Sequence, residues 1–524
     1  MNILTKNNSI KTNFFYLLIL ILFSFFINYY YAKLGSFPID TFLHYDSAYR
    51  ILNGELPIKD YWIASGLIVD ILQSFFFKIF GVNWFAYILH ASLFNCLITI
   101  LIYFFFLKNK INNFKAFLLS ISFSILSYTI SGTPFVDLHA TYFLLIATLL
   151  IINNLNTNKN YLWFIITFSL FLSFLSKQVP AAYGVIFYFF ILTVYFINKK
   201  EFKIIKIIII SLSLLLALIF LFLKLYEIDF INFIIQYLDY PRSIGESRFD
   251  NFKFFFNLFF NKYKFIMAPI IILTFIKLYK IKIKKMKIFS EEFTSYIIFL
   301  TFVLILIFHQ LMTKNQMYIY FLIPILFGYL EIEMNNSSFK IKKLISILLI
   351  TIMVFITVKY HLRFNENRKF HELTKLQLED TADANIIHSS LSGLKWKNPH
   401  FKGTAADEVI LLNKIQKELN SLGNKEVMLV SHYKFLDSIT NKKMNFPNRT
   451  FTTDGVSMPL KKNKYFNFYK DFLINKIKRQ QISEILFLKH EKLPFEIITN
   501  YIEEECYIKK NNHFFYILEL KCFN

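Results

Sequence analysis

The first 360 residues alternate between long apolar runs and short segments that hold most of the charged residues. A helix needs about 20 apolar residues to cross a hydrocarbon core of about 30 Å, and somewhat fewer when Lys side chains at its ends extend to water. The run at 13–32 is too long for a signal-peptide core and lacks a small-residue cleavage pattern, so we expect an uncleaved first span. The whole pattern predicts eleven transmembrane helices, at 13–32, 84–107, 116–136, 138–153, 161–176, 178–198, 207–223, 261–279, 293–313, 315–330 and 344–358.

The segment at 62–80 is also apolar, but its polar residues fall on one side of a helix. Gly66, Asp70, Gln73 and Ser74 are spaced i, i+4, i+7 and i+8, which is one stripe of a helix. A helix of this kind suits the membrane interface better than the membrane interior. We therefore expect 62–80 to lie along the membrane surface and not to cross it.

Positive charge is distributed unevenly between the two ends of the predicted spans. With a cytoplasmic N-terminus, the cytoplasmic segments hold 19 Lys and Arg against five Glu, a net charge of +14. The outer segments up to residue 360 hold 13 basic against 11 acidic residues, a net charge of +2. Because cytoplasmic loops carry an excess of Lys and Arg, this orientation is favoured, and it places the residues after Lys359 outside.

Residues 361–524 follow a different pattern, which predicts a soluble extracytoplasmic α/β domain after a transmembrane domain at 1–360. A small open sheet covered by helices fits the order of elements, and the order allows parallel strands. No nucleotide-binding glycine pattern is present. The expected elements are helices at 405–421, 465–480 and 494–504, strands at 426–431 and 484–489, and a hairpin turning at Asn511 and Asn512.

Composition agrees with a membrane protein of mainly α-helical class. Of the 524 residues, 55% are hydrophobic, which is more apolar surface than one soluble core could use. The formal net charge is +23, but the basic residues separate apolar runs and form no continuous stripe, so nucleic acid is not an expected partner. Three cysteines, Cys96, Cys506 and Cys522, lack metal-type spacing and indicate neither a zinc site nor a disulfide framework.

The first outer loop, at 33–61, is the strongest candidate for a functional site. It holds Asp40, His44, Asp46 and Arg50 beside the end of the first span. Ionisable groups next to a membrane are costly unless they stay hydrated or act on a substrate, so the cluster indicates a site, with a solvated loop as the alternative.

Further polar residues of the later outer segments are expected at the same side of the membrane. Pro241 and Gly245 interrupt the apolar pattern in the loop at 224–264, which predicts an exposed Arg242. The span interiors hold no charged residue at mid-depth, whereas a transporter or proton pump is expected to place ionisable groups there. The other residues of this outer set are Asp137, His139, Lys177, Gln178, Arg248, His309, Lys314 and Gln316.

This arrangement suits transfer of a group from a lipid phosphate. A carboxylate activates an acceptor hydroxyl, and Lys or Arg stabilises the departing phosphate. The alternative for Lys177 and Lys314 is that they only anchor their helices, and for His139 and His309 that they only form hydrogen bonds at helix ends. A second possibility is a divalent cation, Mn or Mg, held by Asp40, His44, Asp46, Asp137 and His139.

The run DTFLHYDSAYRILNGELPIKD, from Asp40 to Asp60, with SGL at 65–67 and KIFG at 78–81, resembles the first outer loop of the GT-C membrane glycosyltransferases. That class includes the protein O-mannosyltransferases, the lipid A aminoarabinose transferases and the lipopolysaccharide-core glycosyltransferases. In this loop the class carries an Asp-Glu pair, then a helix with an Ala-x-x-Leu-Leu-x-Gly pattern and Pro-x-x-Asp. Asp40 matches the Asp of the pair, Thr41 departs from the Glu, and the later positions match Ala48, Leu52, Gly54, Pro57 and Asp60.

The resemblance extends more weakly to residue 330. Asp137 is similar to the family's second outer acid, SKQ at 176–178 to its segment that contacts lipid phosphate, and KNQMYIYFLIPIL at 314–326 to its late helix. It implies that Asp40 and Asp137 are catalytic. Because Thr41 departs from the Glu of the pair, the extra His44 and Asp46 are either replacements or local to a subgroup, and Asp46 is the alternative base. Their placement at the same outer face adds His44, Arg242, Lys314 and Gln316 to Lys177 as the expected substrate site.

The function implied is transfer of a sugar from a polyprenyl-phosphate donor to a glycan, lipid or protein acceptor outside the cell membrane, here a bacterial inner membrane. Asp46 competes with Asp40 as the base, but Arg50 four residues later is expected to pair with it. Two other functions stay open. An O-antigen-type polymerase or ligase uses a similar lipid-linked substrate, and a transporter or flippase moves it without any bond changing.

Overall fold

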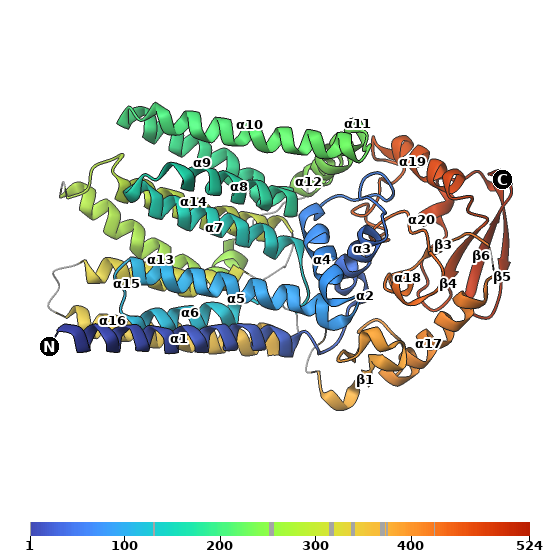
Figure 1. The fold of residues 1–524 in the computed structure, drawn as a ribbon, viewed down its shortest axis with the longest axis horizontal. Helices are drawn as coiled ribbons and strands as arrows, with labels where there is room; N and C mark the ends of the chain where they lie inside the picture. Colours follow the sequence, from blue (N-terminus) through green and yellow to red (C-terminus); the bar gives the residue numbers. More distant parts are fainter. Residues whose placement is uncertain are drawn as a thin grey trace. The chain divides into compact units, whose positions relative to one another are not determined.

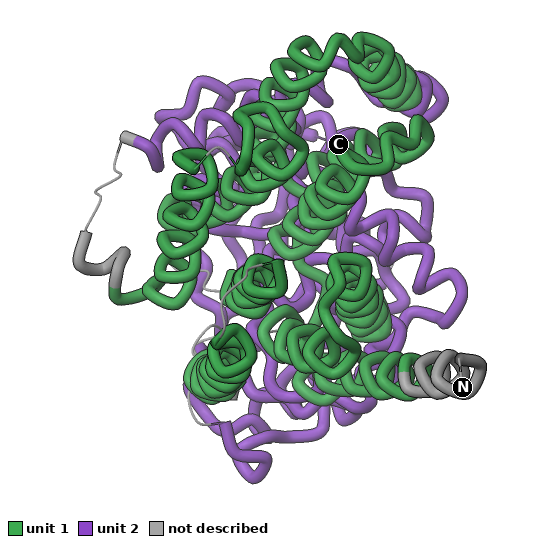
Figure 2. Tube along the Cα trace, turned by 90° about the vertical axis from the view of Figure 1, so that its left-hand side faces the viewer, with its two compact units in different colours: residues 1–32, 88–219, 251–375 green, residues 33–87, 220–250, 376–524 purple. Residues whose placement is uncertain are grey.

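The computed structural model describes residues 2–128, 132–250, 256–283, 285–313, 319–336, 341–366, 373, 376–423 and 425–523. The chain forms two compact units, which Figure 2 shows in green and purple. The first comprises residues 1–32, 88–219 and 251–375, and the second comprises 33–87, 220–250 and 376–524. The units therefore divide the chain differently from the predicted boundary at residue 360, because the first outer loop groups with the tail.

Helices that lie side by side make up the first unit (Figure 1). Within the described residues, α1, α5, α7, α9, α10, α14 and α16 are long and apolar enough to cross a membrane, and α6 and α8 are shorter apolar helices. Every one of the eleven predicted runs contains a helix. Their bounds are α1 (Asn2–Tyr31), α5 (Trp84–Lys108), α6 (Asn113–Ser127), α7 (Val136–Thr157), α8 (Asn160–Ser176), α9 (Gln178–Lys199), α10 (Phe202–Leu225), α13 (Phe256–Lys282), α14 (Glu291–Met312), α15 (Leu322–Asn335) and α16 (Lys342–His361).

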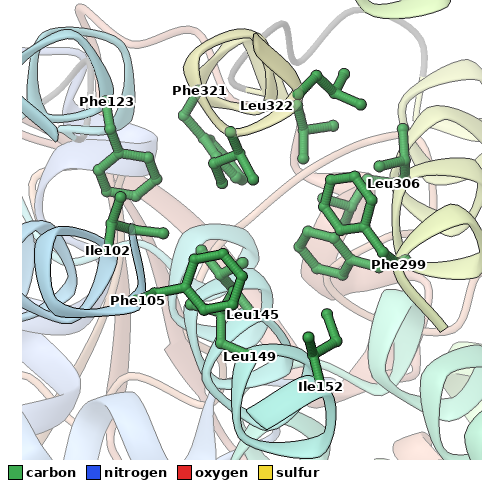
Figure 3. Packing of buried hydrophobic residues seen from close by; sticks show 14 of the residues in the cluster. Ile102, Phe105, Phe123, Leu145, Leu149, Ile152, Phe299, Leu306, Phe321 and Leu322 are labelled. Atoms are coloured by element: carbon green, nitrogen blue, oxygen red, sulfur yellow. The ribbon is translucent and has the colours of Figure 1, made fainter. Parts of the chain in front are cut away.

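Aromatic and branched apolar side chains fill the interior of this bundle. Figure 3 shows Phe105 from α5, Leu145 from α7, Phe299 from α14 and Phe321 beside α15 pointing toward one another. Gly328 lets α15 come close to α5, since a Cβ there would overlap the ring of Phe106. A tightly packed interior of this kind fixes the relative positions of the helix ends.

Two groups of ion pairs connect helix ends at the side of the bundle where α6, α14 and α16 begin. Lys277 of α13 donates hydrogen bonds to Glu292 of α14 at 2.8 Å and to Glu333 of α15 at 2.5 Å. Lys115 of α6 pairs with Glu331 of α15. All of these residues fall in segments that the charge pattern of the sequence assigns to the cytoplasmic side.

The second unit also contains helices. One of them, α12, includes both Pro241 and Gly245, so these residues interrupt the apolar pattern of the sequence but not the helix. Helix α12 continues directly from the π-helical turn Ile235–Asp239, in which the Tyr240 N–H donates to the Ile235 carbonyl. The bounds are α2 (Pro38–Thr41), α3 (Leu43–Leu52), α4 (Leu67–Phe80), α11 (Phe230–Ile234), α12 (Tyr240–Asp250), α17 (Ala405–Ser421), α18 (Leu436–Ile439), α19 (Phe466–Arg479) and α20 (Glu496–Thr499).

Helix α4 occupies the segment predicted to lie along the membrane surface, and its polar stripe is buried. Asp70 and Gln73 are 0% exposed, whereas Phe75, Ile79 and Phe80 are 58%, 54% and 45% exposed. With 14 residues the helix is about 21 Å long, which is shorter than a hydrocarbon core of about 30 Å. The polar side therefore faces protein and the apolar side is exposed.

A four-stranded sheet forms the centre of the tail. Its strands are β3 (Val427–Val430), β4 (Glu484–Leu488), β5 (Tyr507–Asn511) and β6 (Phe515–Leu520), in the order β3-β4-β6-β5. Strands β3 and β4 are parallel and the other two pairings are antiparallel. Both predicted strands and the hairpin are confirmed, but of the helix predicted at 494–504 only α20 is present. The two-residue strands β1 (Ala382–Asp383) and β2 (Lys395–Trp396) form a separate antiparallel pair.

A disulfide between Cys506 and Cys522 links the two sides of the β5–β6 hairpin. The expectation that the cysteines indicate no disulfide was therefore wrong for this pair. Tyr507 pairs with Leu520 in the hairpin, so Cys506 lies one position and Cys522 two positions beyond this pair. The predicted hairpin could have revealed the bond.

Candidate functional site

The ends of three helices in the first unit bring Asp137, Lys177 and His309 together. The Lys177 Nζ donates to both carboxylate oxygens of Asp137, at 2.6 and 2.7 Å. The Nε2 atom of His309 lies 2.7 Å from Asp137 Oδ1. These residues belong to the start of α7, the junction of α8 and α9, and the last turn of α14, as expected for groups at one side of the membrane.

Local backbone structure places these side chains. Helix α7 begins at Val136, so Asp137 lies in its first turn, where the helix dipole favours a carboxylate. Lys177 is extended, with φ −157°, between α8 and α9, and its N–H still donates to the Ser173 carbonyl. His139, two residues after Asp137 on α7, lies with its Nε2 3.1 Å from His90 Nε2 and its Nδ1 2.9 Å from the Phe135 carbonyl oxygen. Both histidines are thus held by helix-end contacts.

Lys177 is the accessible member of this cluster. Its side chain is 22% exposed, whereas those of Asp137 and His309 are 1% and 2% exposed. An ammonium group has three N–H donors, and Asp137 accepts from two directions. Asp137 therefore holds Lys177 in position and leaves it able to contact an anion from the exposed side.

The second unit connects the first outer loop with the tail through Asp70. Arg449 donates to both carboxylate oxygens of Asp70 at 2.7 Å. His44 Nδ1 lies 2.6 Å from Asp70 Oδ1, and Arg449 Nε donates to the Ser47 hydroxyl at 3.2 Å. Arg449 also donates to the carbonyl of Ser65. One buried arginine thus ties α3, α4 and the tail together.

His44 contacts both members of the Asp70–Arg449 pair through one ring nitrogen. Its Nδ1 lies 2.6 Å from Asp70 Oδ1 and 2.9 Å from Arg449 Nη2. His44 is fully buried, and its Nε2 has no hydrogen-bond partner among the described residues. Burial lowers the pKa of His44, although the hydrogen bond and the charge of Asp70 oppose this.

Asp46 is a buried carboxylate with an unusual environment. It is 1% exposed, and neither of its oxygens has a hydrogen-bond partner within the described part of the chain. Burial raises the pKa of Asp46 to about 7, against the opposing effect of Arg50, and Asp437 adds a like charge. A carboxylate that titrates near neutral pH has the property required of a general base.

The predicted pairing of Asp46 with Arg50 is present but weak. The closest approach is 3.8 Å, from Arg50 NH1 to Asp46 Oδ2. Arg50 donates instead to Glu55 at 2.8 and 2.5 Å and to the carbonyl of Phe446 at 2.8 Å. Lys443 approaches the other oxygen of Glu55 at 2.6 Å. Glu55, and not Asp46, is therefore the main partner of Arg50.

Asp40 lies in the short helix α2, immediately after Pro38 and Ile39. It is half-buried, and its N–H donates to the Phe37 carbonyl at 3.0 Å. Its greater exposure leaves it more accessible than Asp46, and the choice of base stays a prediction.

The remaining predicted site residues are not brought to these clusters. Arg242 is 76% exposed on α12 and pairs with Glu246 four residues on, at 3.0 Å. Lys314 and Gln316 lie outside the described residues. In the part of the chain that the structure describes, no three His, Cys, Asp or Glu side chains gather as metal ligands.

Sequence reasoning did not identify Asp70 or Arg449 as members of the site. Asp70 was interpreted only as part of a polar stripe, although a charged residue on an otherwise apolar helix already called for a partner. Arg449 follows a predicted strand by many residues, in a segment with no periodicity. Nothing in the sequence relates it to the first loop.

Comparison with known proteins does not identify a family for this chain. No family model matches the chain, and no curated protein matches it.

Proposed function

We propose that this protein is an integral-membrane glycosyltransferase that moves a sugar from a polyprenyl-phosphate donor to an acceptor outside the membrane. The observation that carries the proposal is the cluster of Asp137, Lys177 and His309 at one end of an apolar helix bundle. A lipid-linked phosphate has its anion at this depth, where an ammonium held by a carboxylate can contact it. The resemblance of the first outer loop and of Asp137 and Lys177 to GT-C enzymes supports the same function.

The reaction also needs a general base. The acceptor hydroxyl must lose a proton as the new bond to the sugar forms and the bond to the phosphate breaks. Asp40 is the proposed base, because it combines partial exposure with the position of the family's catalytic acid. Asp46 is the competing base, because its pKa of about 7 suits proton transfer at neutral pH.

The proposed topology has eleven spans, a cytoplasmic N-terminus and an outer second unit. The charge asymmetry of +14 against +2 supports it. The disulfide between Cys506 and Cys522 supports an oxidising location for the tail, because such bonds are rare in the cytosol. The exposed apolar side of α4 supports a helix that lies along the membrane surface.

Release of the lipid phosphate tests the function directly. Purified protein in proteoliposomes is supplied with synthetic polyprenyl-phosphate sugars, and formation of the free polyprenyl phosphate is measured. Loss of one charge-assisted hydrogen bond costs about 1.5–3 kcal/mol, so Lys177→Ala should weaken donor use by roughly tenfold or more. Lys159→Ala, an exposed lysine just before the other end of α8, is the matched control and should leave donor use unchanged.

Two outcomes distinguish the alternatives. Movement of the intact lipid across the bilayer, with no lipid phosphate released, identifies a flippase and contradicts the proposal. Release that occurs only when the donor carries a chain of sugars identifies a polymerase or ligase.

A further inference from the structure

The second unit contains a cavity of about 330 Å³ that none of the proposed chemistry uses. One of its walls is a single face of α19, because the lining residues recur at the spacing of one helix side. The lining residues of this helix are Phe468, Asp471, Phe472, Asn475, Lys476 and Arg479. The apolar residues Leu473 and Ile477, which are fully buried, belong to the other face of the helix.

The opposite wall comes from Lys59 and from the residues that lead into α11. Lys59 Nζ donates to the carbonyl of Tyr226 at 3.0 Å and lies 3.3 Å from Glu227 Oε2. The Asp229 side chain accepts the N–H of Asn232 at 2.9 Å and so begins the helix. This wall therefore presents an ammonium, two carboxylates and an amide.

The charges that line the cavity are balanced. Lys59, Arg479 and Lys476 face Glu227, Asp229 and Asp471. Arg479 is already paired with Asp60, at 2.6 Å. Burial lowers the pKa of Lys476 to about 7, so this amine carries only part of a charge at neutral pH. A cavity of this composition has no excess of positive charge with which to select a phosphate or a carboxylate.

Two aromatic rings complete the lining. Phe468 and Phe472 lie one turn apart on α19 and are half-buried. Both contact Trp62, with ring centroids 6.2 and 5.8 Å apart, which holds them in place. Rigid apolar faces next to amides and charged groups offer stacking and hydrogen bonds to the same ligand.

We propose that this cavity binds an uncharged saccharide, through stacking on Phe468 and Phe472 and hydrogen bonds to Asn232, Asn475 and the surrounding charged groups. A sugar ring carries C–H faces and many hydroxyl groups, and this lining offers partners for both. Pockets for small molecules occupy about 300–1,000 Å³, so a cavity at the lower end of that range holds on the order of one or two sugar units. That this saccharide is the acceptor of the transfer reaction rests on the proposed function.

Binding is tested without any transfer reaction. The full-length protein in nanodiscs is mixed with lactose, with N,N′-diacetylchitobiose, or with an acidic hyaluronan disaccharide, and saturation-transfer NMR measures contact and affinity. The expected result is binding of an uncharged disaccharide and none of the acidic one. Asn475→Ala should weaken the affinity about threefold to tenfold, the effect of one hydrogen bond, and Phe472→Ala by at least as much.

Asn467→Ala is the matched control, because Asn467 is an exposed asparagine of the same helix that does not line the cavity. Thermal unfolding of each variant excludes loss of structure, and Asn475 is exposed, so its replacement tests the cavity even if Phe472→Ala fails to fold. Absence of binding by both uncharged disaccharides overturns the inference, as does equal weakening by Asn467→Ala or preference for the acidic disaccharide. Release of lipid phosphate by a protein that binds no saccharide in this assay contradicts the inference and leaves the proposed function intact.

Discussion

Arg449 donates hydrogen bonds to both oxygens of Asp70, at 2.7 Å, across 379 residues of the chain. Asp70 is 0% exposed and the Arg449 side chain 7% exposed, so the pair is almost fully removed from water. The two ionised groups compensate each other only while both are present. Loss of either residue therefore leaves the other as a buried charge without its partner, which destabilises the second unit.

We expect Arg449→Met to destabilise the second unit strongly. It leaves the Asp70 carboxylate buried without its cation, which costs about 3–5 kcal/mol. Arg479→Met is the matched control, because Arg479 also pairs with an aspartate at 2.6 Å but is 45% exposed, and such pairs are worth at most about 1 kcal/mol. Thermal unfolding of the purified variants measures both, and equal losses would contradict the importance given to burial.

Replacement of each candidate base by asparagine separates their roles. Asp40→Asn keeps the shape but cannot accept a proton, so it should lower turnover by roughly 10²–10⁴ with little effect on folding. For Asp46, a pKa raised from 3.8 to about 7 means that stability falls as pH rises through this range. Asp46→Asn should therefore stabilise the protein at pH 8 relative to wild type, and less so at pH 4.

The initial rate of sugar transfer at equal protein abundance decides the assignment. An active Asp40→Asn variant together with an inactive, well-folded Asp46→Asn variant would transfer the role of base to Asp46.

Stability should fall in acid because of Glu55. Burial acts to raise the pKa of Glu55, but the charges of Arg50, Lys476 and Lys443 outweigh it and hold the pKa at about 2, against 4.5 unperturbed. A lowered pKa stabilises the folded state above pH 4.5, and this contribution is lost as pH falls from 4.5 toward 2. The contribution is on the order of 3 kcal/mol. Unfolding temperatures of wild type and Glu55→Gln between pH 6 and pH 3 should converge in acid, and a constant difference would contradict the assignment.

Reporter fusions test the proposed topology. A fusion after Lys359 should read as outside, and a fusion within residues 280–287 as cytoplasmic. Single cysteines introduced at Lys59 and Gly81 should react with a membrane-impermeant reagent from the same side, because α4 is too short to cross. A cytoplasmic signal after Lys359 would remove the proposed outer location of the second unit.

Periodicity along the chain was sufficient for most of the helices, and for strands β3 and β4. These elements are recognisable because burial on all sides requires a continuous apolar run, as in Val427–Val430 and Glu484–Leu488. The order of the predicted spans placed Asp137, Lys177 and His309 on the same side of the bundle. Successive spans run in opposite directions, and each of these residues lies at a span end predicted to face that side. Neither result needed knowledge of side-chain packing.

The partners of the first loop could not be predicted in the same way. Spacing within the loop predicted that Arg50 pairs with Asp46. A partner thirty or four hundred positions away in the sequence cannot be recognised from local spacing. Glu55 lies only five residues after Arg50, and spacing alone does not show that Arg50 lies closer to Glu55 than to Asp46. Arg449 comes from a distant segment without regular structure. Long-range ion pairs depend on the tertiary fold, which only the structure shows.

The second unit is built from chain segments that are far apart in the sequence, and this affects its biosynthesis. Residues 33–87 leave the ribosome early, whereas residues 376–524, which complete the same unit, are made only after the last helix of the bundle. A nascent chain must therefore carry an unfinished first loop, with Asp70 lacking its arginine, throughout insertion of the remaining helices. The loop acquires its final structure only after the tail has been translated, so a chain that terminates early contains the candidate catalytic residues without the contacts that position them.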